Sequence, residues 1–581
     1  MKKLLFFAVI CSLFVACRAP KQPADLIVHH AMIYSVDSAF TVYQAMAIKD
    51  GKIIALNTND SIMQCFSSEQ IIDAGGKAVF PGFIDAHCHF LGYAMGLQQC
   101  DLVGTKSFQD VLSKLVTYSQ TCKTEWIVGR GWDQNDWTDK TFPNRKKLDS
   151  LFPDRPVFLV RIDGHAALAN REALLRAGIH SATKVDGGVI EYTFEKDSTW
   201  TLPEYRKDIA HLHYPYWSPT GILIDNAVDM VKQVIPDATA GTTESALLQA
   251  QKNCFEMGLT TVDEAGIHKQ DVELMDKLQK DGKLKMRIYA MLSDDSANYT
   301  YLNTGPYKTD RMNVRSFKFY ADGALGSRGA CLLQDYSDKP GWRGFLLSNP
   351  EHFMKYAKLL YDRGFQMNTH CIGDSAVRLL QWIYNHPGNI SLSKNGMVIA
   401  TPNTAQTPVK ERRWRIEHYQ VCNTADLKNN HGIIPSIQPT HATSDMYWAE
   451  ERLGKDRIRE AYAYKKLLDA AGMVALGTDF PVEDISPFKT FYAAAVRKDS
   501  KGFPAGGFQK ENALSRRETI RGMTIWAAYA NFEESEKGSL EKGKFADFII
   551  LDTDLMTCDE NAILNTKVVG TFINGEQVYK R

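Results

Sequence analysis

The 581-residue sequence has no excess of charge of either sign, because 68 lysines and arginines balance 68 aspartates and glutamates. A nucleic-acid partner normally requires a basic surface, so the composition predicts none. The 11 cysteines include no C-x-x-C pair, which argues against a zinc finger and against a disulfide scaffold. The G-x-S-x-G motif of serine hydrolases is missing, as are low-complexity tracts and internal repeats. A chain of this length needs more than one core, so a large domain with smaller additions is expected.

The N-terminus has the pattern of an export signal. The stretch "MKKLLFFAVICSLFVAC" combines two lysines, an apolar run and a small residue before Cys17, and it is too short for an ordinary membrane-spanning helix. Its last four residues resemble the lipobox of bacterial lipoproteins, although Phe14 stands where leucine is usual. This predicts a signal peptide over 1–17, a tether over 18–24 and a membrane-anchored protein facing the periplasm or the cell surface. Ordinary cleavage and release is the alternative.

Lipidation of Cys17 is directly testable. One acyl chain gives only marginal membrane binding, so the multiple acylation typical of such lipoproteins is what makes the attachment stable. We expect a Cys17→Ser variant to move from the membrane fraction to the soluble fraction. A variant that still fractionates with membranes as the parent does would rule out this anchor.

Both ends of the chain show short alternating strand patterns. Residues 25–78 contain the hairpin signal Asp50-Gly51, and residues 531–581 contain Asn574-Gly575. Neither end has enough strands to bury a sheet face alone, so we expect them to join in one small β-sandwich.

Residues 79–530 alternate apolar strand-like runs with amphipathic stretches, which indicates βα units around a parallel sheet. Eight such units are the number in an α/β protein of the (β/α)8 TIM-barrel type, whose active site lies at the C-terminal ends of the strands. The connections over about 100–245 are longer than a barrel needs, so an insertion capping the mouth is expected. The strand candidates are "AVFPGFIDAHCH", "PVFLVRIDGHA", "LTTVDEAG", "VRSFKFYADG", "GFQMNTHCIGD", "RWRIEHYQ", "GIIPSIQPTHA" and "MVALGTDFPVED".

The first of these candidates ends in "PGFIDAHCHF". In a strand, Asp85, His87 and His89 share one face. Two imidazoles that converge on one point favour a divalent metal site. A pair of hydrogen-bonded core histidines is the alternative.

The polar residues at the predicted strand ends extend this pattern. They are His87, His89, Asp163, His165, Glu264, Lys318, Asp322, His370, His418, His441 and Asp479. The candidates among them are the H-x-H pair, Lys318, His370, His418 and Asp479. Here the sequence resembles the amidohydrolase superfamily of metal-dependent hydrolases, and more narrowly its amidohydrolase-3 branch, the YtcJ-like and N-substituted formamide deformylase group. The resemblance covers essentially the whole mature chain. It departs from the family at "VDEAG", where a His-Asp pair is more usual. The matching motifs are "FPGFIDAHCHF", "GWDQNDW", "RIDGHAALAN", "PTGILIDNA", "LTTVDEAG", "KFYADGALGSRGA", "HCIGDSAV", "RIEHYQ", "SIQPTHATSDM", "GTDFPVEDISPF" and "KGKFADFIILD".

The resemblance implies a metal-ligand set of His87, His89, Lys318, His370, His418 and Asp479. Lys318 alternates with Phe317 and Phe319, so it is expected to point into the barrel. In the family solution such a lysine is carboxylated by CO2 and bridges two metals. A salt bridge from Lys318 to Asp322 is the alternative.

The predicted ligands are nitrogen and oxygen atoms, which suit zinc and also iron, manganese or nickel. Zinc is the default, as one or two ions that activate a water molecule. Asp479 is expected to move the proton from this water to the leaving nitrogen. The predicted reaction is hydrolysis of an amide or formamide C–N bond in a small molecule. Two alternatives stay open: hydrolysis of an ester or cyclic amide, and a non-catalytic binding lipoprotein of the same fold.

Substrate contacts are predicted at the barrel mouth. Trp132, Asp133, Trp137 and Arg328 lie in motifs expected there, although tryptophans in a cap are more often packing residues. His441 is a candidate for polarising the scissile carbonyl, with a hydrogen bond inside its own loop as the alternative. Homodimer formation is left open.

Overall fold

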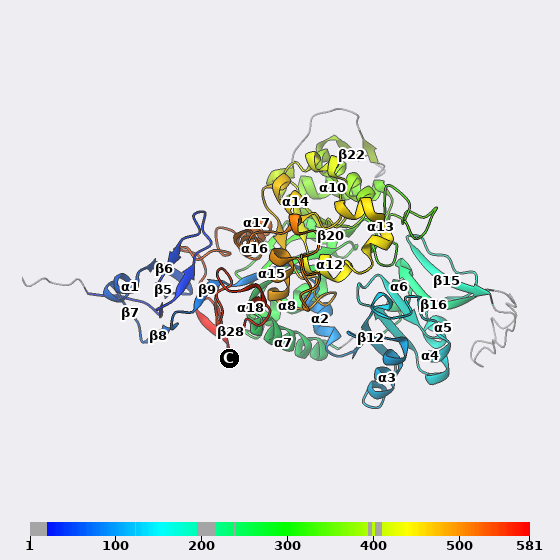
Figure 1. The fold of residues 1–581 in the computed structure, drawn as a ribbon, viewed down its shortest axis with the longest axis horizontal. Helices are drawn as coiled ribbons and strands as arrows, with labels where there is room; N and C mark the ends of the chain where they lie inside the picture. Colours follow the sequence, from blue (N-terminus) through cyan, green and yellow to red (C-terminus); the bar gives the residue numbers. More distant parts are fainter. Residues whose placement is uncertain (1–19, 123, 195–216, 237–238, 393–397, 401–408) are drawn as a thin grey trace, which may run out of the picture.

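The computed structural model describes residues 20–122, 124–194, 217–236, 239–392, 398–400 and 409–581 (Figure 1). The predicted lipidation site, Cys17, lies outside these residues. Among the helices that are described, none is both long enough and apolar enough to cross a membrane.

Eight parallel strands form a nearly closed barrel, which confirms the predicted TIM-type fold. The last strand meets the first through backbone hydrogen bonds beyond the regular ladder: the Asp479 N–H donates to the His87 carbonyl at 2.8 Å, and the His89 N–H to the Phe480 carbonyl at 2.8 Å. In spatial order the strands are β10 (Phe83–Cys88), β17 (Leu259–Ile267), β18 (Arg287–Ser293), β20 (Met312–Tyr320), β21 (Gln366–Cys371), β24 (Arg415–His418), β25 (Ile434–Ile437) and β26 (Ala475–Leu476).

One of the eight predicted barrel strands belongs to a different sheet, so that prediction is wrong. The run "PVFLVRIDGHA" forms β13 (Val157–Arg161), which pairs with β12 (Ile127–Trp132) and β14 (Ala166–Ala169) in a separate sheet. The barrel strand that the sequence reading missed is β18, which pairs with β17 and β20. Both segments are short, apolar and buried, so periodicity alone does not tell which sheet each one joins.

Helices surround the barrel and pack with its strands in one large hydrophobic core (Figure 1). Helix α10 illustrates their local signals: the Asn349 side chain caps it by accepting from the His352 N–H, proline occupies the first turn, and Gly364 ends it with φ 74°. The main helices in chain order are α2 (Phe90–Gly96), α7 (Ala240–Glu256), α8 (Lys269–Lys280), α10 (Pro350–Arg363), α11 (Asp374–Asn385), α12 (Pro439–Asp445), α13 (Ala449–Arg457), α14 (Tyr464–Ala471), α15 (Pro487–Val496), α16 (Arg516–Gly522) and α17 (Ile525–Ala530).

A second sheet is inserted between β10 and β17, on the right of Figure 1. Its buried strands pack against α3 (Phe108–Ser119) on one side and α5 (Arg171–Arg176) and α6 (Asn226–Lys232) on the other. The insertion therefore has cores of its own and meets the barrel at the mouth. Its strand order is β11 (Cys100–Asp101), β12, β13, β14, β16 (Trp217–Asp225) and β15 (Gly188–Phe194).

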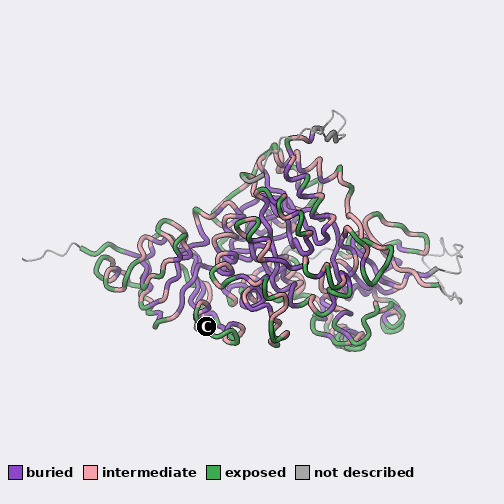
Figure 2. Tube along the Cα trace, turned by 45° about the horizontal axis from the view of Figure 1, so that its top comes forward, coloured by how far each residue is buried: buried purple, intermediate pink, exposed green. Residues whose placement is uncertain are grey.

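The two ends of the chain lie together on the left of Figure 1. A four-stranded sheet and a six-stranded sheet share one hydrophobic core, which includes Val28, Ile48 and Phe548. Figure 2 shows that buried segments are concentrated in the middle of the molecule and exposed ones toward its outer parts. The strand orders are β6 (Lys52–Asn57), β5 (Ala45–Lys49), β2 (Leu26–His29), β8 (Gln70–Asp73), and β29 (Glu576–Lys580), β28 (Val568–Ile573), β27 (Phe548–Leu551), β9 (Ala78–Pro81), β3 (Met32–Tyr34), β4 (Val42–Tyr43).

Candidate metal centre and active site

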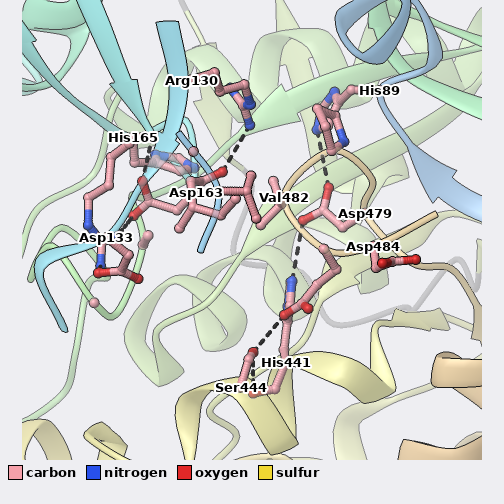
Figure 3. A pocket seen from close by; sticks show the side chains of 18 of the residues that line it. His89, Arg130, Asp133, Asp163, His165, His441, Ser444, Asp479, Val482 and Asp484 are labelled. Carbon is pink, nitrogen blue, oxygen red and sulfur yellow. Dashed lines mark hydrogen bonds and ion pairs between the residues drawn. The ribbon is translucent and has the colours of Figure 1, made fainter. Parts of the chain in front are cut away.

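Histidines at or just beyond the ends of the barrel strands meet Asp479 at the C-terminal mouth of the barrel, and Figure 3 shows His89 and His441 beside it. The Oδ1 atom of Asp479 lies 3.2 Å from His89 Nε2 and 3.6 Å from His87 Nε2. Its Oδ2 atom lies 3.5 Å from His441 Nε2 and 3.8 Å from His418 Nδ1. Asp479 is thus the common neighbour of two groups that could each hold a metal ion.

Local backbone conformation brings these groups together. His418 has φ 69° and Asp479 has φ 64°, a left-handed conformation that is uncommon for residues with a side chain. Asp85 fixes the neighbouring loop, because its carboxylate accepts from the Thr478 N–H at 2.9 Å and from the Thr478 hydroxyl at 2.7 Å. Asp85 therefore positions Asp479 rather than joining the histidine cluster.

The outer ring nitrogens of two histidines are oriented by polar partners that sequence reasoning missed. Glu417 accepts a hydrogen bond from His87 Nδ1, and Gln438 Oε1 lies 2.8 Å from His418 Nδ1. Such partners commonly fix the ring orientation of metal-binding histidines. Burial works against the charge of Glu417, but Arg415 and His87 lower its pKa to about 2.

The surroundings favour neutral imidazoles at His87 and His418 and an ionised carboxylate at Asp479. Burial, together with the nearby charge of Lys318, lowers the pKa of His87 to about 4. Burial likewise lowers the pKa of His418 well below its ordinary range. For Asp479 burial acts in the opposite sense, yet the hydrogen bond from His89 and the surrounding histidines hold its pKa well below the ordinary value. Neutral imidazoles and an ionised carboxylate are the forms that bind divalent metals.

His370 and Lys318 complete the floor of the site. His370 is 2% exposed, and its Nε2 atom has no hydrogen-bond partner among the described residues. Lys318 Nζ lies 3.1 Å from His87 Nε2, and no described carboxylate lies within ion-pair distance of it. Phe319 packs beside Tyr356 of α10, so Lys318, its neighbour on β20, faces the cavity.

The proposed alternative for Lys318, a salt bridge to Asp322, does not form. Asp322 instead accepts the N–H groups of Ile372, Gly373 and Cys331. Its carboxylate thereby ties the end of β20 to the loop that follows β21.

Glu264 occupies the position where the sequence departs from the family pattern. It is 2% exposed and accepts a hydrogen bond from the Leu91 N–H at 2.8 Å. Burial raises the pKa of its carboxyl from 4.5 to about 8. Between about pH 4.5 and 8, the Glu264 carboxyl is therefore protonated in the folded protein but ionised in the unfolded chain.

This pKa predicts a specific pH dependence. Between about pH 4.5 and 8 the folded state binds more protons at Glu264 than the unfolded state, so its contribution to stability falls as pH rises. Glu264→Gln keeps a hydrogen-bond acceptor and loses the titration. We expect its melting temperature, relative to the parent, to increase across this window and to level off above it. Glu273→Gln, at an exposed position on α8, is the control. A constant difference between Glu264→Gln and the parent would contradict the prediction.

The cluster opens into a cavity of about 770 Å³ that the barrel and the insertion line together. From the insertion come Arg130, Asp133, Asp163 and His165, which Figure 3 places opposite Asp479 and His441. A volume of this size suits a small organic molecule.

His165 was expected among the polar residues at the strand ends, but the sequence analysis gave it no role in the site. Its Nδ1 atom lies 2.7 Å from Asp225 Oδ1, and its ring centroid lies 4.9 Å from that of His370. Burial alone would lower the pKa of His165, but the bond to Asp225 raises it. Asp225 has φ 52°, and its carboxylate lies where a side chain on Gly323 or Gly329 would come within 2.6 Å. His165 lies in "RIDGHAALAN" and Asp225 in "PTGILIDNA", but no spacing rule predicts that these two motifs come together.

The predicted substrate contacts are corrected in part. Trp132 is 1% exposed, donates its indole N–H to the Leu159 carbonyl and packs in the core of the insertion, as does Trp137. Arg328 pairs with Asp338 at 2.9 Å and does not line the cavity. Asp133 does line it, but its carboxylate is engaged by Arg161 at 2.5 Å. Aromatic and arginine side chains in a cap serve packing as readily as binding, and sequence does not separate the two.

His441 lies in the first turn of α12 rather than on the seventh barrel strand. Pro439 begins this helix directly after β25, so the strand ends earlier than the apolar pattern suggested. The shift carries the imidazole over the mouth, where it faces Asp479.

Comparison with known proteins agrees with this geometry. The sequence profile described as "Amidohydrolase family" matches residues 70–205 and 212–579. The chain is 29% identical to the putative amidohydrolase YtcJ of Bacillus subtilis over 95% of its length and 99% of the relative's. It is 24% identical to the N-substituted formamide deformylase of Arthrobacter pascens, over 96% of its own length and 99% of that enzyme's. A crystal structure of an uncharacterized metal-dependent hydrolase from Pyrococcus horikoshii superposes with a TM-score of 0.70 at 25% identity, covering 92% of this chain and 99% of that one. Profile, relatives and fold agree: the chain belongs to the amidohydrolase family.

Proposed function

We propose that the protein is a divalent-metal-dependent hydrolase that cleaves a C–N bond of the amide or formamide type in a small molecule. The observation that carries this proposal is the convergence of several imidazoles on one ionised, buried carboxylate, Asp479, at the mouth of the barrel. The similarity to an N-substituted formamide deformylase supports the choice of bond.

The side chains present fit a metal ion. His370 Nε2 is a buried nitrogen without a hydrogen-bond partner in the described structure, which is costly unless something binds it. His87 and His418 have their Nδ1 atoms engaged by Glu417 and Gln438, so Nε2 is the nitrogen for a ligand role, although in His87 it now has Lys318 Nζ at 3.1 Å. The donors are nitrogen and oxygen atoms only, and zinc suits such a set.

His87, His89, His370, His418 and Asp479 would hold the metal, with Lys318 and His441 beside them. A divalent ion bound there lowers the pKa of a coordinated water toward neutrality and polarises a substrate carbonyl. Asp479 accepts the proton of the attacking water at a carboxylate oxygen and delivers it to the leaving nitrogen. Its surrounding histidines keep it ionised, so its oxygens carry no proton before this step.

His165 is proposed to position the substrate. Asp225 engages its Nδ1 atom, so Nε2 is the ring nitrogen available to a bound molecule in the cavity. Because the insertion supplies this residue, the barrel provides the reacting groups and the insertion provides a wall of the substrate site.

An activity screen tests the proposed function. The metal-loaded protein is assayed against N-formyl and N-acyl amines, with release of the free amine as the readout, and against esters and cyclic amides, with release of the acid as the readout; chelator treatment is the control. We expect turnover that metal removal abolishes, and a lower kcat/KM with unchanged metal content for His165→Asn. Absence of turnover on amides, esters and cyclic amides alike would contradict an enzyme and favour the binding protein.

We further propose that Lys318 carries a carboxylate. Burial lowers the pKa of this lysine to about 8, which increases the share of neutral amine that can add to CO2 and release a proton. Lys537 is a suitable comparison, since it is also buried but pairs with Glu533 at 2.7 Å.

Native mass analysis in bicarbonate should therefore show one added CO2 on the parent and none on Lys318→Met. Lys537→Met should retain the added mass. A parent with an unmodified Lys318, full metal content and full activity would contradict the proposal.

A further inference from the structure

A second group of metal-binding side chains lies on the β-sandwich, outside the barrel. His29 ends β2, His30 follows it, and Asp73 ends β8. The two strands are parallel neighbours, with His29 and Asp73 in register. One possible ligand atom from each residue lies within 4.8 Å of the others.

Consecutive residues in a strand normally point to opposite faces, so two neighbouring histidines should diverge. Here the chain turns at His30, which has φ 50° in the left-handed region. The ring centroids of His29 and His30 are consequently 4.2 Å apart. An uncommon backbone conformation thus brings both imidazoles to one side.

Backbone hydrogen bonds hold this turn in place. The carbonyl of His29 accepts the Ala74 N–H at 2.9 Å, and the carbonyl of His30 accepts the Gly76 N–H at 2.6 Å. The His30 N–H donates to the Asn59 side chain at 2.8 Å. The histidine pair is therefore arranged before any ligand binds, which reduces the entropy lost on binding.

Asp73 is oriented in the same way. Its Oδ1 atom accepts the Gly75 N–H at 2.8 Å, and its Oδ2 atom lies 3.0 Å from His30 Nδ1. Two atoms bound tetrahedrally to one zinc ion at about 2.0–2.1 Å lie roughly 3.3 Å apart, so a small movement would let both bind the same ion. The side chains of His30 and Asp73 are 55% and 57% exposed, which leaves room for water as further ligands.

We propose that His29, His30 and Asp73 form a surface site for a divalent transition metal such as Zn²⁺ or Ni²⁺. Two imidazoles and one carboxylate are the ligands that these ions prefer. β8 is an edge strand of the four-stranded sheet and is paired on one side only. A bound ion would link the end of this edge strand to the turn after β2. The site is independent of the proposed enzymatic activity.

Equilibrium dialysis of the full chain against Ni²⁺ tests the proposal, with metal bound per chain as the readout. The variants are His30→Asn, chosen because asparagine tolerates the left-handed conformation, and Asp73→Asn, which keeps an acceptor for Gly75. The control is His431→Asn, which removes another exposed imidazole. We expect the parent and the control to bind one equivalent more than either variant.

Hydrogen exchange gives a second, local readout. Ni²⁺ should slow exchange of the β8 amides in the parent and in His431→Asn, but not in His30→Asn or Asp73→Asn. Because all four proteins share the barrel residues, metal bound there cancels in the comparison. Equal stoichiometry in the four proteins, or equal protection of β8, would overturn the assignment.

Discussion

Asp479→Asn is expected to reduce kcat by about 10²- to 10⁴-fold while the protein keeps its metal and its fold. The amide preserves the shape of the side chain and one oxygen, but it cannot accept a proton at the pH of the assay. His89 Nε2 lies 3.2 Å from an oxygen of Asp479, and the oxygen of asparagine can still accept its hydrogen bond. The loss should therefore appear in the chemical step rather than in stability.

Three measurements on one preparation decide this prediction: kcat on a substrate identified by the screen, metal per chain, and melting temperature. Asp484→Asn provides the matched control, because Asp484 is 45% exposed near the same mouth and pairs with Lys489. Near-normal kcat for Asp479→Asn would remove this residue from the mechanism. A large drop in melting temperature with normal kcat per folded molecule would mark a structural role.

Arg415→Met is expected to cause the largest loss of stability, of about 3–5 kcal/mol. Arg415 is fully buried, with Asp263 at 2.9 Å and Glu417 at 2.7 Å. Removal of the guanidinium leaves two carboxylates buried without their cation. Burial already raises the pKa of Asp263 to about 7, even with Arg415 in place. Because Glu417 accepts from His87, the metal site should be disturbed as well.

Thermal unfolding of parent and variants under identical conditions measures this effect. Arg343→Met makes the same substitution in an exposed ion pair, since Arg343 is 62% exposed and lies 2.7 Å from Asp335. Exposed pairs contribute about 0–1 kcal/mol, so this control should unfold close to the parent. If Arg415→Met unfolds no earlier than Arg343→Met, the buried network does not stabilise the fold.

Sequence reasoning identified the groups that lie at strand ends. His87, His89, Lys318, His370, His418 and Asp479 all line the cavity or lie at its floor, because alternation along a barrel strand fixes which side chains point inward. The same argument did not predict that Glu417 contacts the site. It neighbours His418 in the chain, and strict alternation would turn one of them away from the site. The left-handed backbone at His418 breaks the alternation, so both side chains can face the site. No residue type in the sequence predicts this backbone conformation.

The sequence also did not predict contacts between residues that are far apart in the chain. His165 and Asp225 are 60 residues apart in the sequence. His165 directly precedes β14, and Asp225 is the last residue of β16. Their pairing follows from the sheet order β13–β14–β16, which no local pattern encodes. The exchange of β13 for β18 in the predicted barrel has the same origin. Local periodicity indicates that a segment is a buried strand, whereas only packing decides its neighbours.

Because both ends of the chain build the sandwich, its N-terminal strands are synthesised long before their C-terminal partners. Val79 of β9 pairs with Ile550 of β27, a partner 471 residues further along the chain. At about 5–20 residues per second, a ribosome needs roughly 25 to 95 seconds to make that partner. Until then β9 has an unpaired edge, the kind of surface that invites pairing with another chain. The newly made protein is therefore open to such pairing until its last strands emerge.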